Sequence, residues 1–128
     1  MRFEQFVFQL SPSDYEQSVQ FYQEWLGLEL IRAWNRPTDK GSLLSAGQAA
    51  VVELVNPPDG QRYEGPAPAN ARLLFEVASA DDEFARLSQY PITVVEPPTD
   101  RAWGHRSFRL RDPDGILVTF YQLIPPTV

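Results

Sequence analysis

The segment "ARLLFEVASADDEFARLSQY", residues 71–90, combines a strand with a capped helix, and the chain opens with the same combination. Residues 71–77 alternate apolar and polar side chains with the period of a half-buried strand. Ser79 then precedes an acidic helical run, and Asp82 lies near the third helical position. The exposed amides and the macrodipole of a helix start favour a carboxylate there. The segment predicts a strand over 71–77 and a helix beginning at Ser79.

The start of the chain repeats this order. Residues 3–10, "FEQFVFQL", predict a strand, and residues 11–27, "SPSDYEQSVQFYQEWLG", predict a helix that ends at Gly27. Ser13 followed by Glu16 matches a capping box, which places the helix start at Ser13. Ser13 and Ser79 lie 79 − 13 = 66 residues apart.

Three further strands follow each predicted helix. They cover "LELIRAW" (28–34), "GSLLSAG" (41–47) and "AAVVELV" (49–55) in the first half, and "ITVVE" (92–96), "RSFRLR" (106–111) and "ILVTFYQL" (116–123) in the second. The last strands of the two halves are centred on Glu53 and Thr119, which also lie 119 − 53 = 66 residues apart. The pattern therefore predicts two tandem βαβββ modules.

The predicted fold class is α+β, with the two modules forming a curved mixed sheet and both helices on its outer face. We expect one domain over 1–128, with a first module over 1–56 and a second over 71–128. The linker 57–70 is rich in proline and contains two glycines. A tight turn is expected near Gly47 and Gln48.

The two faces of the predicted strands differ in composition. The face expected to pack on the helices carries Phe6, Phe8, Leu10, Val52, Leu54, Leu73, Phe75, Val77, Val118 and Phe120. The opposite face carries Gln5, Gln9, Glu53, Arg72, Glu76, Thr119 and Tyr121, mixed with Val7, Val51, Val55, Leu74 and Leu117. An antiparallel sheet can present such a face to water. Alternatively, the sheet curls and this face lines a cleft for a small organic molecule.

Composition excludes several functional classes. A net charge of −6 with a single lysine, Lys40, disfavours nucleic acid, whose binding requires clustered cations. No segment has the roughly 20 apolar residues of a membrane span, and the first residues lack signal-peptide character, so we expect a cytoplasmic protein. His105 is the only histidine and there is no cysteine, so a self-contained zinc or iron site is not expected. A hard cation bound only by oxygen atoms stays open as an alternative.

Four segments together resemble a known superfamily. They are "SVQFYQEWLGLEL", "AVVELV", "LLFEV" and "WGHRSFRLRDPDGILVTFYQ", in this order along the chain. The chain resembles the vicinal oxygen chelate superfamily of glyoxalases, bleomycin resistance proteins and extradiol dioxygenases. Within the last segment, "DPDG" predicts a turn in which Pro113 takes the second position, Asp114 bonds neighbouring amides and Gly115 has a positive φ.

The resemblance implies where a metal would bind. Metal-dependent members take ligands from the first and last strands of each half, which correspond here to Gln5, Glu53, Arg72 and Thr119. Arg72 offers only donors and a positive charge, and Thr119 offers a neutral hydroxyl. We therefore expect no metal and no cofactor, as in the bleomycin-resistance-like members.

The resemblance also implies a ligand site. Trp103 in "RAWGHRSF" offers a surface for stacking, Gly104 allows close approach, and Arg106 can hold an anionic or carbonyl group. Structural roles are open as alternatives: Trp103 as an anchor to the core, Arg106 in an ion pair, His105 as a solvated loop residue, and Glu53 with Arg72 as a salt bridge. Trp34 and Tyr63 are candidates for an aromatic rim. The expected ligand-binding residues are Gln5, Glu53, Arg72, Trp103, Arg106, Thr119 and Tyr121.

Three functions fit these residues. The favoured one is a metal-free protein that binds a small organic molecule, for example an aromatic or toxic compound, in a cleft, and that forms a homodimer. The second is a lyase, isomerase or dioxygenase-type enzyme of the same superfamily, with Glu53 as base or metal ligand. The third is a module that binds another protein through the linker and the tail "LIPPTV".

Overall fold

The computed structural model describes residues 1–47, 49–56 and 65–127, which divide into two compact units, Met1–Gly65 and Pro66–Val128. Most of the predicted linker, with Tyr63, and Gln48 of the predicted turn lie outside the described residues. No helix in the described ranges is both long enough and apolar enough to cross a membrane.

The described residues of the first unit form one helical segment and four strands. They are β1 (Phe6–Leu10), α1 (Tyr15–Val19) with the π-helical segment η1 (Gln20–Trp25), β2 (Glu29–Asn35), β3 (Lys40–Ser45) and β4 (Ala50–Asn56). The sheet order is β1-β4-β3-β2. β1 pairs with β4 in parallel, and the other pairs are antiparallel.

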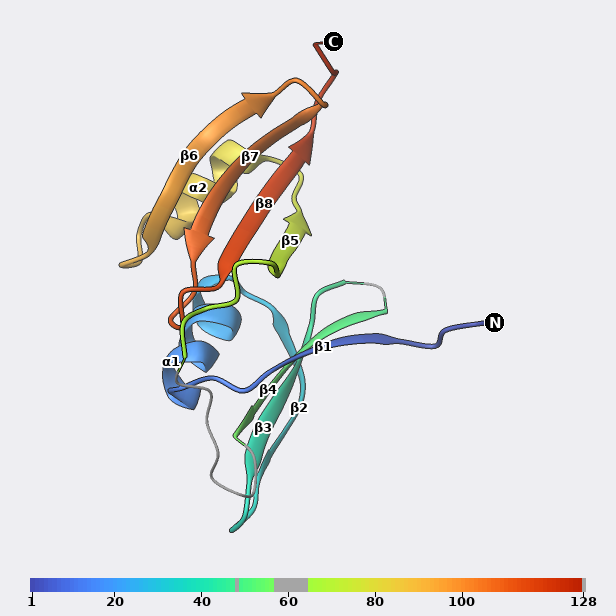
Figure 1. Cartoon of the computed structure of the whole chain (residues 1–128), viewed down its shortest axis with the longest axis vertical. Coiled ribbons are helices and arrows are strands. Elements are labelled where there is room, and N and C mark those ends of the chain that lie inside the picture. The colour runs from blue at the N-terminus through green and yellow to red at the C-terminus, as the bar shows by residue number, and fades with distance from the viewer. Residues whose placement is uncertain (48, 57–64, 128) are drawn as a thin grey trace. The chain divides into compact units, whose positions relative to one another are not determined.

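The second unit repeats this topology. Its elements are β5 (Arg72–Glu76), α2 (Ala80–Leu87), β6 (Thr93–Arg101), β7 (His105–Arg111) and β8 (Leu117–Leu123), with the sheet order β5-β8-β7-β6. In each unit the helix packs on one face of the sheet (Figure 1). The predicted α+β fold of two βαβββ modules with mixed sheets is therefore confirmed.

One of the two predicted helix starts is correct. Ser79 caps α2, and its hydroxyl accepts a hydrogen bond from the Asp82 amide at 3.2 Å. The predicted capping box at Ser13 is wrong, because Asp14 takes the extended backbone of a cap and accepts from the Gln17 amide at 3.1 Å. Both residue types cap helices well, so sequence alone did not separate them.

The first helix widens after one turn. The amide of Leu26 donates to the carbonyl of Phe21 at 2.9 Å, five residues earlier, as in a π-helix. The extra residue in this turn brings Phe21 and Tyr22 into the core together, with 1% and 0% exposure. A constant 3.6-residue period would not turn both of these consecutive side chains to the core. Gly27 ends the helix with φ of 83°, as predicted.

The two units are offset by 65 residues at their starts. Gln9 pairs with Glu53 across β1 and β4, as Leu74 pairs with Thr119 across β5 and β8. Gln9 thus corresponds to Leu74 (74 − 9 = 65), whereas Glu53 and Thr119 differ by 66, so the second unit has one additional residue between these strands. The same offset makes Val7, not Gln5, the counterpart of Arg72.

Half of the ten predicted core residues are buried, and four others, Phe8, Leu10, Phe75 and Val77, are partly exposed. The side chains of Val52, Leu54, Leu73, Val118 and Phe120 are all buried. Phe6 is an exception, with 65% exposure, because it is the first residue of an edge strand. In the second unit Phe108 lies at the centre of the core, with its ring 4.8 Å from that of Phe120 and 5.2 Å from that of Phe84.

Candidate functional site

Each sheet has one face turned away from its helix, and we call these the first and second open faces. Strand pairing assigns Gln9, Glu29, Arg32, Trp34, Leu43 and Glu53 to the first open face. It assigns Arg72, Leu74, Glu76, Glu96, Arg101, His105, Ser107, Arg109, Arg111, Leu117, Thr119 and Tyr121 to the second. Buried helix-side residues between them, such as Leu54 and Phe120, confirm the alternation.

Glu53 lies at the middle of the first open face. Its carboxylate accepts a hydrogen bond from the side-chain amide of Gln9 on the neighbouring strand. On its other side it faces the apolar Leu43 of β3. One carboxylate oxygen is therefore held by a neutral donor, and the group is half-buried.

Trp34 is a fixed aromatic side chain on the same face. Its indole lies over Gly41, where an added Cβ would be only 2.3 Å from the Trp34 Cζ2 atom. The indole nitrogen donates to Asp39 Oδ2 at 2.8 Å, and the guanidinium of Arg32 lies 5.2 Å from the ring centre. Gly41 thus allows the tryptophan to lie flat on the sheet.

A cavity of about 270 Å³ lies beside Tyr15, Glu16, Ala33, Trp34, Asn35 and Lys40. Its charged groups satisfy one another, because Lys40 Nζ is 2.9 Å from Glu16 and 5.2 Å from the centre of the Tyr15 ring. Among the described candidates for the ligand site, only Trp34 lines it.

The second open face carries an aromatic row. His105 stacks on Tyr121, with ring centres 4.4 Å apart and an interplanar angle of 14°. Trp103 completes the row. Its ring lies edge-on to the His105 ring, with the ring centres 6.4 Å apart. Trp103 is 63% exposed, so it is not an anchor to the core. Gly104 has φ of 95°, which holds this turn in a shape that other residues rarely adopt.

A charged cluster lies next to the aromatic row. Arg101 Nη2 is 2.6 Å from Glu96 Oε2, and Arg109 Nη1 is 3.7 Å from the same oxygen. Arg101 Nε also donates to the buried Ser107 hydroxyl at 3.3 Å. The hydrogen bond from Arg101 lowers the pKa of the Glu96 carboxyl, and the charges of Arg101 and Arg109 lower it further, against the opposing effect of desolvation. The cluster is thus one anion between two cations.

The sequence analysis did not select Glu96, Arg101 or Arg109 as site residues. The strand expected over 92–96 continues to Arg101 through two irregularities in its pairing with β7, which the alternation pattern does not reveal. Arg109 was detectable, because it belongs to the strand predicted over 106–111. Its pairing opposite Thr119 follows once the "DPDG" turn joins that strand to the last one.

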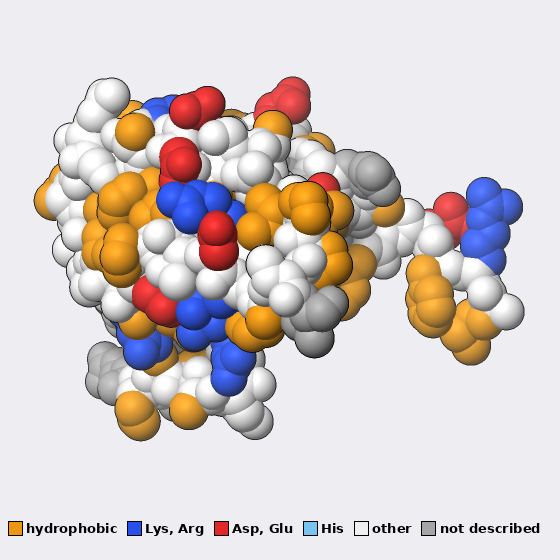
Figure 2. Space-filling model, turned by 90° about the horizontal axis from the view of Figure 1, so that it is seen from above, with side chains coloured by type: hydrophobic (Ala, Val, Ile, Leu, Met, Phe, Trp, Pro, Cys, Tyr) orange, Lys and Arg blue, Asp and Glu red, His pale blue; other side chains and the backbone are white. Residues whose placement is uncertain are grey.

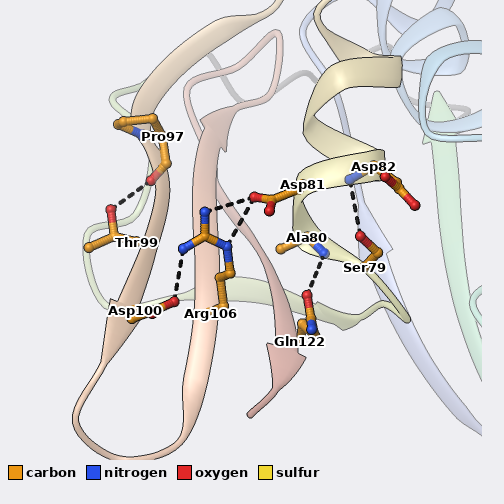
Figure 3. Close-up of polar contacts among 9 residues, drawn as sticks. All are labelled: Ser79, Ala80, Asp81, Asp82, Pro97, Thr99, Asp100, Arg106 and Gln122. Atoms are coloured by element: carbon orange, nitrogen blue, oxygen red, sulfur yellow. Dashed lines mark hydrogen bonds and ion pairs between the residues drawn. The ribbon is translucent and has the colours of Figure 1, made fainter.

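Arg106 lies on the helix side of the second sheet. Its Nε and Nη2 atoms are 3.0 and 2.8 Å from Asp81 Oδ1, and its Nη1 atom is 2.8 Å from Asp100 Oδ1 (Figure 3). Hydrogen bonds with Asp100 and then Asp81 raise the pKa of the guanidinium. Beside it, Gln122 accepts from the amide of Ala80 at the start of α2. Figure 2 shows basic side chains flanked by acidic ones, with hydrophobic side chains around them. Of the two roles expected for Arg106 from the sequence, ligand binding or an ion pair, the structure therefore shows the ion pair.

The structure separates the predicted ligand-binding residues into groups. Arg72, Thr119 and Tyr121 share the second open face, and Trp103 joins its aromatic row from the turn between β6 and β7. Glu53 belongs to the first open face, in a different unit from Arg72. Arg106 lies on the helix side. Gln5 precedes β1 and is exposed.

The metal-ligand positions implied by the resemblance do not fit a divalent cation. With the corrected offset they are Val7, Glu53, Arg72 and Thr119. A valine offers no donor atom, an arginine repels the ion, and a threonine supplies only a neutral hydroxyl. In the part of the chain that the structure describes, no three His, Cys, Asp or Glu side chains are grouped so as to hold a metal ion.

Comparisons with known proteins agree with the fold of two repeated units. The family model of the Glyoxalase/Bleomycin resistance protein/Dioxygenase superfamily matches residues 4–120. The chain belongs to this superfamily.

Three relatives extend over most of the chain. Two are uncharacterized proteins of Bacillus subtilis (strain 168). YwkD is 34% identical over 115 residues, 86% of this chain and 89% of the relative. YraH is 27% identical over 124 residues, 90% of this chain and 94% of the relative. The crystal structure of TnmS3, an antibiotic binding protein from Streptomyces sp. CB03234, has a TM-score of 0.76 and 25% identity, and covers 96% of this chain and 98% of that one.

Proposed function

We propose that this superfamily member is a metal-free binding protein for a small organic molecule with an aromatic ring system. The ligand lies on the second open face, against the row formed by Trp103, His105 and Tyr121. This row is the observation that carries the proposal, because an exposed indole beside stacked rings offers a flat surface to a planar ligand.

Other residues of the face support the same function. Leu74 and Leu117 provide apolar area on either side of Thr119 and Arg72. Apolar walls with a few polar groups are typical of small-molecule sites. The similarity to TnmS3, an antibiotic binding protein, supports a small-molecule ligand. Arg106 is engaged on the other side of the sheet and contributes to the start of α2 instead.

A thermal-shift screen with aromatic antibiotics tests the proposal. A ligand at about 100 times its Kd stabilises the folded protein by about 2.7 kcal/mol, which raises Tm by roughly 5–15 °C. We expect at least one such shift, and Trp103→Ala should reduce it. Equal shifts in the wild-type protein and the variant would contradict binding at the aromatic row.

The same ligand separates binding from catalysis. We expect its Tm shift to be unchanged by EDTA, because the proposed contacts involve no metal. After prolonged incubation, mass spectrometry should recover the ligand intact. Conversion of the ligand that depends on Glu53, tested with Glu53→Gln, would replace the binding function by the enzyme alternative.

We also propose that the protein forms a homodimer. Several large apolar side chains are exposed in each unit, including Val7 and Ile31 in the first and Val94 and Val95 in the second. Apolar surface of this kind is commonly covered by a partner. Analytical ultracentrifugation at micromolar concentration should give the mass of two chains, and a monomer throughout would contradict this.

A further inference from the structure

We propose that the ligand of the second open face is an aromatic anion, a planar ring system with a carboxylate or phenolate group that Arg109 and Arg101 bind. This inference rests on the proposed function and specifies the chemistry of the ligand at the same face. It follows from the charge of the face, the state of the two guanidinium groups and their position beside the aromatic row.

The second open face is basic although the chain is acidic. Among its described residues are four arginines, at 72, 101, 109 and 111, and two glutamates, at 76 and 96, which leaves 4 − 2 = 2 positive charges, His105 apart. The whole chain has a net charge of −6. On the first open face Arg32 stands against Glu29 and Glu53. The potential of the second open face therefore favours an anion.

The arginine pair is incompletely neutralised. Glu96 is close to Arg101, at 2.6 Å, but 3.7 Å from Arg109, which is beyond a normal hydrogen bond. The Nε atom of Arg109 is buried and has no hydrogen-bond partner among the described residues. A buried donor without an acceptor is unfavourable, so the protein itself does not fully satisfy this guanidinium. The Arg109 side chain as a whole keeps 31% exposure, so an anionic acceptor can reach its exposed part and form charge-assisted hydrogen bonds there.

The basic and aromatic groups are neighbours on one surface. Arg101 pairs with His105 across β6 and β7, and Arg109 pairs with Thr119 across β7 and β8. Tyr121 lies two residues from Thr119 and stacks on His105. Cross-strand and diagonal neighbours lie roughly 5–8 Å apart, which matches the span from a fused ring system to its acidic substituent.

Calorimetric titration with 2-naphthoate and with its neutral counterpart 2-naphthamide tests this assignment. We expect the carboxylate to bind about tenfold more tightly than the amide, because it forms charge-assisted hydrogen bonds. Glu96→Gln should increase this preference, since it removes the competing anion. Arg109→Gln should reduce it to about one. Arg86→Gln, which removes the same charge from α2, should leave it unchanged.

The outcomes distinguish this inference from the proposed function. If neither compound binds although the thermal-shift screen finds a ligand, the proposed function stands and the anion assignment is overturned; if the screen also finds none, both fail. If both bind with equal affinity, or if Glu96→Gln weakens the preference, the ligand site stands and the anion assignment is overturned. Loss of the preference in Arg106→Gln, with Arg109→Gln unaffected, would place the anion on the helix side of the sheet and also overturn it.

Discussion

Phe108→Ala is expected to lower the free energy of unfolding by about 3–5 kcal/mol. Phe108 has no exposed surface. Its ring stacks on Phe120 at 4.8 Å and meets Phe84 of α2 edge-on at 5.2 Å, so it joins the helix to two strands. The truncation removes buried apolar area and leaves a cavity that the rigid sheet cannot close. Urea denaturation followed by circular dichroism measures the change.

Two variants control this experiment. Phe108→Leu keeps most of the apolar volume and should cost about 1–2 kcal/mol. Trp103→Ala removes a larger aromatic side chain, but one that is 63% exposed, and should change stability by about 0.5 kcal/mol or less. If Phe108→Ala and Trp103→Ala have similar effects, the helix of the second unit does not pack on Phe108 as the structure has it.

The fold was predictable because two independent signals coincide in it. Alternation gives the buried side of β8, with Val118 and Phe120, and the helix cap at Ser79 gives the start of α2. The same signals recur one module earlier. A slip of one residue in either strand would expose the whole apolar set, so the pattern fixes strand faces well.

The site was less predictable because it depends on strand pairing. Glu96, Arg101 and Arg109 converge through the irregular pairing of β6 with β7, and no local pattern encodes such irregularities. Arg106 is the opposite case, because it was predicted as a site residue but does not lie on the open face. It lies in the segment that resembles ligand-binding relatives, but its neighbour in sequence, Ser107, is the one that points to the open face. Family resemblance located the segment, and the register decided the residue.

In the "DPDG" turn, too, the sequence predicts the backbone shape but not which side chain makes the contacts. The positive φ of Gly115, 86°, was predicted, and its amide closes the turn on the Asp112 carbonyl at 2.9 Å. The side-chain acceptor is a surprise. Asp112 Oδ1 accepts from the amides of Asp114 and Ile116, each at 2.9 Å, whereas the sequence assigned this role to Asp114. Asp112 and Asp114 lie two positions apart and carry the same carboxylate. The path of the backbone decides which of the two accepts the hydrogen bonds of the turn.

Asp112→Ala is therefore expected to destabilise the protein by about 2–4 kcal/mol, since it leaves two amides without their acceptor. Asp112 is 5% exposed and Ile116 is 9% exposed, so water replaces the lost carboxylate poorly. Asp112→Asn keeps an oxygen at the same position and should cost clearly less, about 1 kcal/mol. Guanidinium denaturation of the two variants gives the comparison.

The turn also connects stability to ligand binding. It joins β7 to β8 and so sets the register that places Arg109 opposite Thr119 on the second open face. A folded Asp112→Ala protein whose turn has loosened should bind 2-naphthoate less tightly, while Asp112→Asn should bind it as the wild-type protein does. Equal destabilisation by alanine and asparagine would show instead that the negative charge of Asp112, rather than its acceptor oxygen, holds the turn.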